Sequence, residues 1–275
     1  MADENYVTIA SVRRTAGIDS DEINDTDVGA IIAECEPQVE RFYNTSFIPK
    51  ERIDILDGNG TSRIFLDKNP VLSVRELRID GDTEDPANLN ISKESGKIVL
   101  NSSATTSTFI AKEKTIVVKY LYGMLEESST NTITSQASTA GTNVGLIVGS
   151  ITDFSEDDWI EIYGMDGKRE VAQINASPSV NTIQVDQLIL SHESGSKVVK
   201  LQINEVFKKL MNIACAIAMV ARIVGQSYTD TVGYGLGELN VQKGEPYTQW
   251  RETANQLIIE RDLLMATIKP RPCIR

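Results

Sequence analysis

The sequence contains very little histidine and cysteine, the residues that bind zinc in most structural metal sites. Its 275 residues include one histidine, His192, and three cysteines. No two cysteines form a C-x-x-C pair, so a zinc site with Cys and His ligands has almost nothing to bind the metal. The odd number and wide spacing of Cys35, Cys215 and Cys273 predict reduced thiols in a protein made inside a cell.

Positive charge is also scarce. The chain has 27 Lys and Arg against 39 Asp and Glu, a formal net charge of −12 at pH 7 with a pI near 4.7. Non-specific nucleic-acid binding needs basic side chains that neutralise phosphates and release counterions. The composition therefore argues against such binding, and any contact with DNA should be non-adhesive.

Long apolar runs are missing as well. The most apolar stretch, Leu210 to Val224, covers about 15 residues and includes Asn212 and Arg222, whereas a membrane-spanning helix needs roughly 20. We therefore predict a buried core helix there and no membrane partner. The first ten residues, MADENYVTIA, are polar and acidic and do not resemble a signal peptide.

The N-terminal residues show helix signals. Thr8 to Ala16 predicts a short helix capped by Thr8 and ended by Gly17. A second helix follows with apolar positions from Val28 to Phe42, and Pro37 should kink or split it. Asp25 or Asp27 could cap this helix. The acidic cluster to which they belong could be a metal site or a set of solvent-facing acids of the first helical turn. The cluster lacks the glycine and terminal glutamate of an EF-hand loop, which favours the second interpretation. Its members are Asp19, Asp21, Asp25 and Asp27.

Residues 51–122 alternate between apolar and polar and predict strands. Between the first two runs stands the tetrad Asp57-Gly-Asn-Gly60. As a calcium loop it would need a glutamate at its twelfth position, which is Lys68. Asn and Gly adopt positive φ easily, so the tetrad predicts the tip of a hairpin between its flanking strands.

The composition changes after Met124. The Ser- and Thr-rich stretch of residues 125–143 predicts a linker, and several short alternating runs between Leu146 and Leu201 predict a small all-β barrel or sandwich. Helical periodicity returns from Ile203 to Gly225. After a glycine-rich loop, Pro246 opens a last helix that carries Trp250 on its apolar face.

These patterns predict an α+β fold, in which a helical body carries a β-hairpin or small sheet. Residues 1–123 and 203–268 would form this body, because two tandem domains would leave the last helices nothing to cover their apolar faces. Residues 128–202 would be an inserted all-β domain, and 269–275 a C-terminal tail stiffened by prolines.

No pattern predicts an active site. A catalytic role for His192 would need a converging nucleophile and acid, but its neighbours share one turn and no G-x-S-x-G elbow occurs. The segment GYGLGE, Gly233 to Glu238, has the wrong spacing for a dinucleotide loop. Its Tyr234 and Leu236 suit contact with a neighbouring subunit instead. We therefore predict no catalytic, cofactor-binding or metal-binding residue, and a structural or interaction protein.

The order of these pieces resembles the head–tail connector, or adaptor, proteins of tailed double-stranded DNA phages. The resemblance runs through VRRTAGIDSDEINDTDVGAIIAECEPQVERFYN, RIDILDGNGTSRIFLDKNPVLSVRELRIDG, VVKYLYGM and INEVFKKLMNIACAIAMVARIVG. It covers most of the chain outside residues 128–202. Those residues are similar to a small β module frequent in phage structural proteins, in which a His-x-x-Gly pattern corresponds to His192 and Gly195.

The resemblance implies a virion protein made in the host cytoplasm and located in the neck. It would form a ring, usually of twelve subunits, beneath the portal protein, continue the DNA channel without specific DNA binding, and present a surface to the next tail-side protein. Ring subunits meet head to tail and need two different faces. The helix of residues 246–268, with Trp250, is a candidate for one of them, and the alternative is that its apolar stripe belongs to the core. In such adaptors the C-terminal region often docks on the portal, which would involve Arg271, Ile274 and Arg275.

Three alternatives remain. A tail-completion or tail-tube component is a second kind of structural protein, which a mainly helical body disfavours. A decoration protein would use the β module to bind carbohydrate or a partner, with Trp159 and Tyr163 as its available aromatic residues. An enzyme would need catalytic groups that the sequence does not offer.

Overall fold

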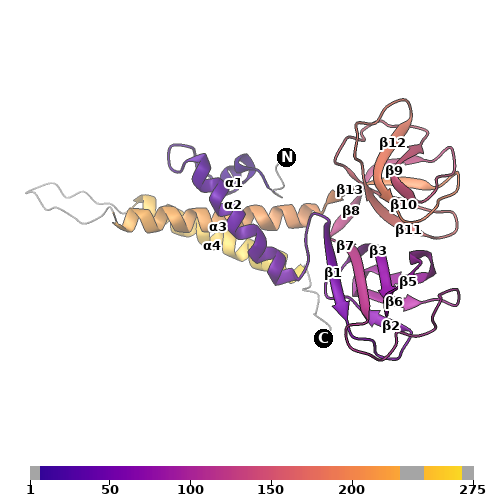
Figure 1. Cartoon of the computed structure of the whole chain (residues 1–275). Helices are drawn as coiled ribbons and strands as arrows, with labels where there is room; N and C mark the ends of the chain where they lie inside the picture. Colours follow the sequence, from indigo (N-terminus) through magenta and orange to yellow (C-terminus); the bar gives the residue numbers. More distant parts are fainter. Residues whose placement is uncertain (1–6, 230–244, 268–275) are drawn as a thin grey trace, which may run out of the picture. The chain divides into compact units, whose positions relative to one another are not determined.

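The computed structural model describes residues 7–229 and 245–267, which fold into two compact units (Figure 1). The helical unit combines the residues up to Tyr43 with those from Asn204 onward, and the β unit comprises Asn44–Ile203. The described residues form four helices and several small antiparallel sheets. The predicted α+β fold class is therefore confirmed.

The helical unit begins with the predicted short helix. The helix α1 covers Ile9–Ala16, and Thr8 and Ser11 form a capping box in which each side chain accepts a hydrogen bond from the other's backbone N–H. Gly17 ends the helix in the left-handed conformation, with φ of 66°.

The helix α2, Asp25–Tyr43, begins differently from the prediction, and Pro37 does not divide it. Asn24 takes the capping position, because its side-chain oxygen accepts the hydrogen bond of the Asp27 backbone N–H, at 2.8 Å. The acids Asp25 and Asp27 stand in the first turn instead. Pro37 lies inside the helix without splitting it.

The helix α3, Glu205–Thr229, is the centre of the helical unit. The helices α1, α2 and α4 (Glu245–Thr267) each pack against it (Figure 1). Its inward face is apolar and fully buried at Phe207, Leu210, Met211, Ile213, Cys215, Ala216, Met219 and Val220. The predicted buried core helix is confirmed, and among the described helices none is both long and apolar enough to cross a membrane.

The first half of the β unit contains two sheets around one core. The larger sheet has the order β1-β7-β3-β4, and the smaller has the order β2-β6-β5. The bounds are β1 Lys50–Leu56, β2 Arg63–Phe65, β3 Val71–Ile79, β4 Asp82–Glu84, β5 Leu89–Ser92, β6 Lys97–Leu100 and β7 Ile116–Tyr122, with short 3-10 turns at Pro86–Asn88 and Lys93–Ser95. Tyr120 and Phe109 are the largest side chains fully buried in the shared core.

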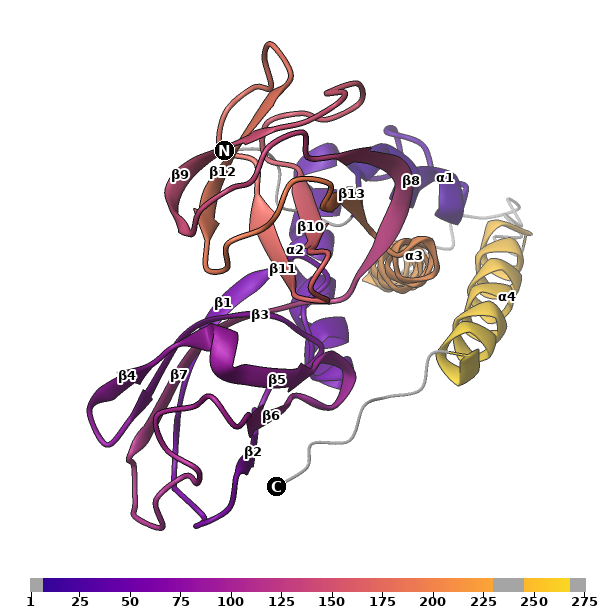
Figure 2. The ribbon, with the colours of Figure 1, turned by 90° about the vertical axis from the view of Figure 1, so that its right-hand side faces the viewer.

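The second half of the β unit is a small closed barrel (Figure 2). One sheet has the order β11-β10-β13-β8 and the other pairs β12 with β9. The isolated bridges Thr134–Val148 and Ile174–Val185 join the two sheets at both edges, so the strands close into a ring around one core. The bounds are β8 Leu125–Ile133, β9 Gly141–Ile147, β10 Trp159–Tyr163, β11 Arg169–Gln173, β12 Thr182–Leu188 and β13 Lys197–Ile203. Of the two predicted forms, a small barrel or a sandwich, the structure has the barrel.

Two sequence predictions about connections are wrong. The predicted linker is largely strand: β8 runs through it, and its β-branched Thr132 is buried. The tetrad from Asp57 to Gly60 does not turn a hairpin, because β1 pairs with β7 whereas β2 pairs with β6. It crosses between two sheets and lies against residues 109–114. Gly58 approaches the carbonyl oxygen of Ile110 so closely that a Cβ atom would stand 1.6 Å from it.

The two halves of the β unit share apolar and ionic contacts. Leu72 and Leu121 from the first half pack with Val171 and Leu201 from the barrel in one cluster. The buried Arg75 guanidinium reaches Asp186 of β12, with an N–O distance of 3.2 Å. The predicted division into a body of residues 1–123 and 203–268 with an insertion of residues 128–202 stays a prediction.

A buried carboxylate organises the first half of the β unit. Asp54 accepts hydrogen bonds from the Tyr120 hydroxyl at 2.8 Å, the Asp67 backbone N–H at 2.9 Å and Arg52 at 2.6 Å. Burial, followed by the hydrogen bond to Asp54, raises the pKa of Tyr120 far above its usual value. The phenol therefore stays neutral and donates to the carboxylate.

We predict that Asp54→Ala lowers the free energy of unfolding by about 3 to 5 kcal/mol, because it leaves buried donors without their acceptor. Urea unfolding monitored by circular dichroism measures the change. Asp82→Ala, which removes an exposed carboxylate from the same sheet, is the matched control. Equal stability of the two variants would contradict the structural role of Asp54.

Candidate interaction surfaces

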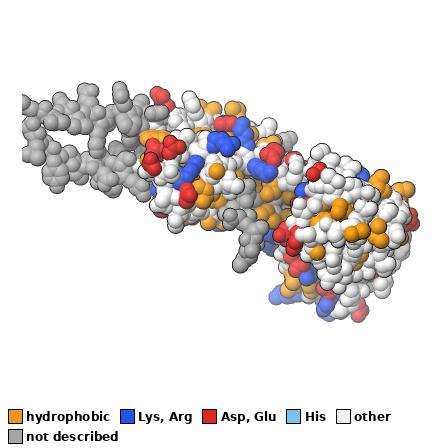
Figure 3. All heavy atoms as spheres, turned by 90° about the horizontal axis from the view of Figure 1, so that it is seen from above, with side chains coloured by type: hydrophobic (Ala, Val, Ile, Leu, Met, Phe, Trp, Pro, Cys, Tyr) orange, Lys and Arg blue, Asp and Glu red, His pale blue; other side chains and the backbone are white. Residues whose placement is uncertain are grey.

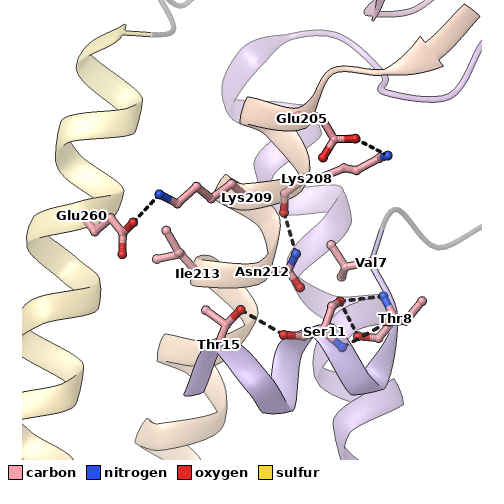
Figure 4. Close-up of a pocket in the computed structure, with 10 residues that line it drawn as sticks. All are labelled: Val7, Thr8, Ser11, Thr15, Glu205, Lys208, Lys209, Asn212, Ile213 and Glu260. Atoms are coloured by element: carbon pink, nitrogen blue, oxygen red, sulfur yellow. Dashed lines mark hydrogen bonds and ion pairs between the residues drawn. The ribbon is translucent and has the colours of Figure 1, made fainter. Parts of the chain in front are cut away.

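A pocket of about 460 Å³ opens in the helical unit between α1, α3 and α4 (Figure 4). The segment around α1 contributes hydroxyl groups, α3 contributes charged groups and an amide, and α4 contributes a carboxylate. The lining residues are Val7, Thr8, Ser11, Thr15, Glu205, Lys208, Lys209, Asn212, Ile213 and Glu260.

Most polar groups of this pocket are already paired within the chain. Lys208 pairs with Glu205 at 2.7 Å, and Lys209 pairs with Glu260 at 2.6 Å across to α4. Asn212 donates from its amide nitrogen to the Lys208 carbonyl at 3.0 Å, whereas its side-chain oxygen is buried and has no partner. Among its described lining residues, the pocket contains no nucleophile with an adjacent base.

The two described cysteines lie together in the helical unit. Cys35 of α2 is half-buried, Cys215 of α3 is buried, and both are free thiols. A hydrogen bond between them lowers the pKa of Cys35, and the same bond together with burial raises the pKa of Cys215 well above its usual value. The prediction of reduced thiols stays a prediction, and Cys273 lies outside the described residues.

The single histidine has a structural position in the barrel. His192 is buried, and its Nε2 lies 2.5 Å from the Glu170 carboxylate. Glu170 also accepts hydrogen bonds from the backbone N–H groups of Ile189 at 2.8 Å and Leu190 at 3.2 Å. The pair is sealed from solvent and holds a loop against β11, which fits the predicted structural role of His192.

The barrel aromatics do not form an open binding platform. Tyr163 donates a hydrogen bond to Glu127, and the Arg169 guanidinium lies 4.2 Å from the centroid of its ring. Lys197 also lies over this ring, at 5.6 Å. Trp159 is partly buried and packs against the cluster that joins the two halves of the β unit. Neither ring is therefore free to stack on a sugar.

The helix α4 has apolar residues on two faces. Leu257 is buried against the unit, whereas Ile259 and Leu263 are 62% and 67% exposed. The spacing of four residues puts these two side chains on one outward stripe. The predicted interface residue Trp250 lies on α4 and is half-buried. The other predicted contact residues, Tyr234, Leu236, Arg271, Ile274 and Arg275, lie outside the described residues.

The sequence interpretation missed the outward stripe, although the signal was present. The prediction for this helix considered the apolar residues of its inward face and left out Ile259 and Leu263, which are four residues apart on the opposite face. The pocket left no such signal, because its lining comes from three helices that are distant in sequence.

Charged side chains of both signs are interspersed over the helical unit (Figure 3), and the described residues contain no group of three or more potential metal ligands.

We predict that Glu170→Ala destabilises the protein by about 3 to 5 kcal/mol, because it leaves His192 and two backbone N–H groups buried without an acceptor. Thermal and urea unfolding measure the loss. Glu193→Ala, at an exposed position in the same loop, should change stability by less than about 0.5 kcal/mol. A Glu170 variant as stable as this control would refute the structural assignment of the pair.

Comparison with known proteins identifies one family. Residues 5–136, just under half of the chain, match the family described as HCP, head completion protein. No curated protein matches. The family is structural and non-enzymatic, which confirms the prediction that the chain is not an enzyme. The match over this part of the chain supports a relation to phage head completion proteins, structural components of the virion at the head–tail junction.

Proposed function

We propose that the protein is a head–tail adaptor that forms a ring under the portal, extends the DNA channel and offers a docking surface to the next tail component. The observation that carries this proposal is the head completion match over residues 5–136. This match runs from α1 through α2 and the whole first half of the β unit, and so includes parts of both compact units.

The outward face of α4 supports the formation of a ring. A cyclic assembly needs two different complementary faces on each subunit. Ile259 and Leu263 form an exposed apolar stripe that would bury against the next copy, and burying apolar area drives such association. Trp250 stands on the opposite side of α4 from this stripe, so it is proposed, with Tyr234 and Leu236 from the preceding part of the sequence, as part of the second face.

The net charge supports passage of DNA without retention. With a formal net charge of −12, each copy in a ring adds negative charge around the proposed channel. DNA phosphates are repelled by such a wall, so the duplex can slide through without specific binding.

The barrel is proposed as an inserted module that binds a partner. The family match ends at residue 136, so it leaves out most of the proposed insertion of residues 128–202. A carbohydrate-binding decoration module is the weaker proposal, because Tyr163 is covered by Arg169 and Lys197 and Trp159 packs inward.

The ring proposal predicts that purified protein mixed with portal forms ring-capped portals in negative-stain micrographs. Leu263→Asp should abolish the ring and leave the helical circular dichroism unchanged, because it puts a charge into the proposed interface. Ile110→Asp, at an exposed apolar position in the β unit, is the matched control and should form rings. Folded protein that never binds portal would refute the adaptor proposal.

The C-terminal proposal is that Arg271, Ile274 and Arg275 dock on the portal. Deletion of residues 269–275 should weaken portal binding and leave the thermal midpoint unchanged. Binding measured with purified portal by light scattering or biolayer interferometry tests this. Unchanged affinity of the truncated protein would show that the portal contact lies elsewhere on the chain.

A further inference from the structure

The helices α2 and α3 run in opposite directions and contact each other toward both ends. Asp27, near the start of α2, pairs with Arg222 of α3 at an N–O distance of 2.9 Å. At the other end, the rings of Tyr43 and Phe207 meet edge to face with their centroids 5.5 Å apart. The two contacts are 16 residues apart on α2 and 15 apart on α3, so the helices stay in register between them.

The two described cysteines lie at the middle of this contact. Cys35 is eight residues from either end contact on α2, and Cys215 is seven and eight residues from those on α3. Their thiols are hydrogen-bonded to each other. The end contacts use long side chains, whereas the central one uses two of the shortest. The two helices therefore approach each other most closely at the thiols.

The two thiols differ in access and in acidity. Cys35 is half-buried and reachable from solvent, whereas Cys215 is buried. The hydrogen bond that the Cys215 thiol donates lowers the pKa of Cys35, although burial and the charges of Glu34 and Glu36 act in the opposite direction. The same hydrogen bond and burial raise the pKa of Cys215. Since the thiolate is the reactive form of cysteine, Cys35 is the thiol that a dissolved oxidant attacks first.

We propose that Cys35 and Cys215 are a redox pair, which closes into a disulfide between α2 and α3 when the chain meets a peroxide. The Cys35 sulfur bonds to one peroxide oxygen, the O–O bond breaks, and the other oxygen leaves as water with the proton of Cys35. The Cys215 sulfur then attacks this sulfenic acid, so that an S–S bond forms, the S–O bond breaks and a second water leaves with the proton of Cys215. Two thiols are oxidised, and one hydrogen peroxide is reduced to two water molecules.

The geometry favours the second step over further oxidation of Cys35. Sulfur atoms in hydrogen-bond contact need only a small further approach to reach the S–S bond length of about 2.05 Å. Cys215 is therefore in place to attack the sulfenic acid as soon as it forms.

The position of this disulfide decides its effect. It joins a helix of the N-terminal part of the chain to one of the C-terminal part, and the loop that it closes, from residue 35 to residue 215, contains the whole β unit. Such a cross-link restricts the unfolded chain and thereby stabilises the fold. Thiols stay reduced inside most cells. Under the proposed function, on which this last step rests, the bond forms when the particle leaves the host cell.

The first test exposes the purified full-length protein to hydrogen peroxide, alkylates the remaining thiols and digests the chain with trypsin without reduction. Mass spectrometry should find the peptide of residues 15–41 linked to that of residues 210–222. The thermal midpoint followed by circular dichroism should rise by about 5 to 10 °C and return to its original value with dithiothreitol. Cys273→Ala is the matched control and should show the same link and the same rise, whereas Cys35→Ala should show neither.

The second test separates the roles of the two thiols with dimedone, which labels sulfenic acids. In Cys215→Ala, peroxide should leave Cys35 as a sulfenic acid that takes the label. In Cys35→Ala, the buried Cys215 should stay unlabelled. A mere packing role for the two side chains would give no label in either variant.

Four results would overturn the proposal: no link between the two peptides in the oxidised natural chain, a link that needs Cys273, a midpoint unchanged by the link, or labelling of Cys215 in Cys35→Ala. All four are measured on the purified chain and are independent of the proposed function. Absence of the chain from purified phage particles would overturn the proposed function and leave the redox pair intact.

Discussion

Burial of α3 against helices from both ends of the chain is the constraint on which the architecture depends. Its apolar face needs α1 and α2 from the N-terminal part and α4 from the C-terminal part. The chain must therefore leave the helical unit after Tyr43 and return at Asn204. The segment between these two residues can vary without exposing the apolar face of α3, as long as the two ends of the segment lie close together. A β unit that closes on its own cores satisfies that condition.

Within the β unit, an acidic chain places several carboxylates inside and satisfies each with hydrogen bonds. Asp54 and Glu170 have been described. Glu84 is buried, which would raise its pKa, but hydrogen bonds from Asn88 and Thr105 outweigh this and lower the pKa of its carboxyl group. Glu161 is held by Lys93 and Arg169. Such fixed networks determine which loop lies against which strand, and closing the barrel removes the unpaired edges that invite aggregation.

Local signals in the sequence predicted much of the fold. The Thr8 cap, the Gly17 stop, the core helix from Ile203 and five of the barrel strands follow from periodicity and capping chemistry. Local signals of this kind did not predict which strands pair with each other. The tetrad at Asp57 carries ordinary turn residues, yet its conformation is determined by residues 109–114, far along the chain. The polar strand β8 was mistaken for a linker because threonine suits both exposed loops and barrel walls. The pocket depends on such long-range contacts, so no local pattern revealed it.

The distribution of charge divides the surface into parts with different physical behaviour. Most of the chain is strongly acidic and repels both DNA and other copies at a distance, an effect that salt screens. Contacts that must hold under these conditions are best made where charge is absent or already paired. In the helical unit, the pocket meets this requirement through its ion pairs Lys208–Glu205 and Lys209–Glu260. In the barrel, it is met by residues 128–152 and 174–185, which contain no ionisable side chain. Association through such a neutral surface depends on apolar burial and is therefore insensitive to moderate changes in ionic strength.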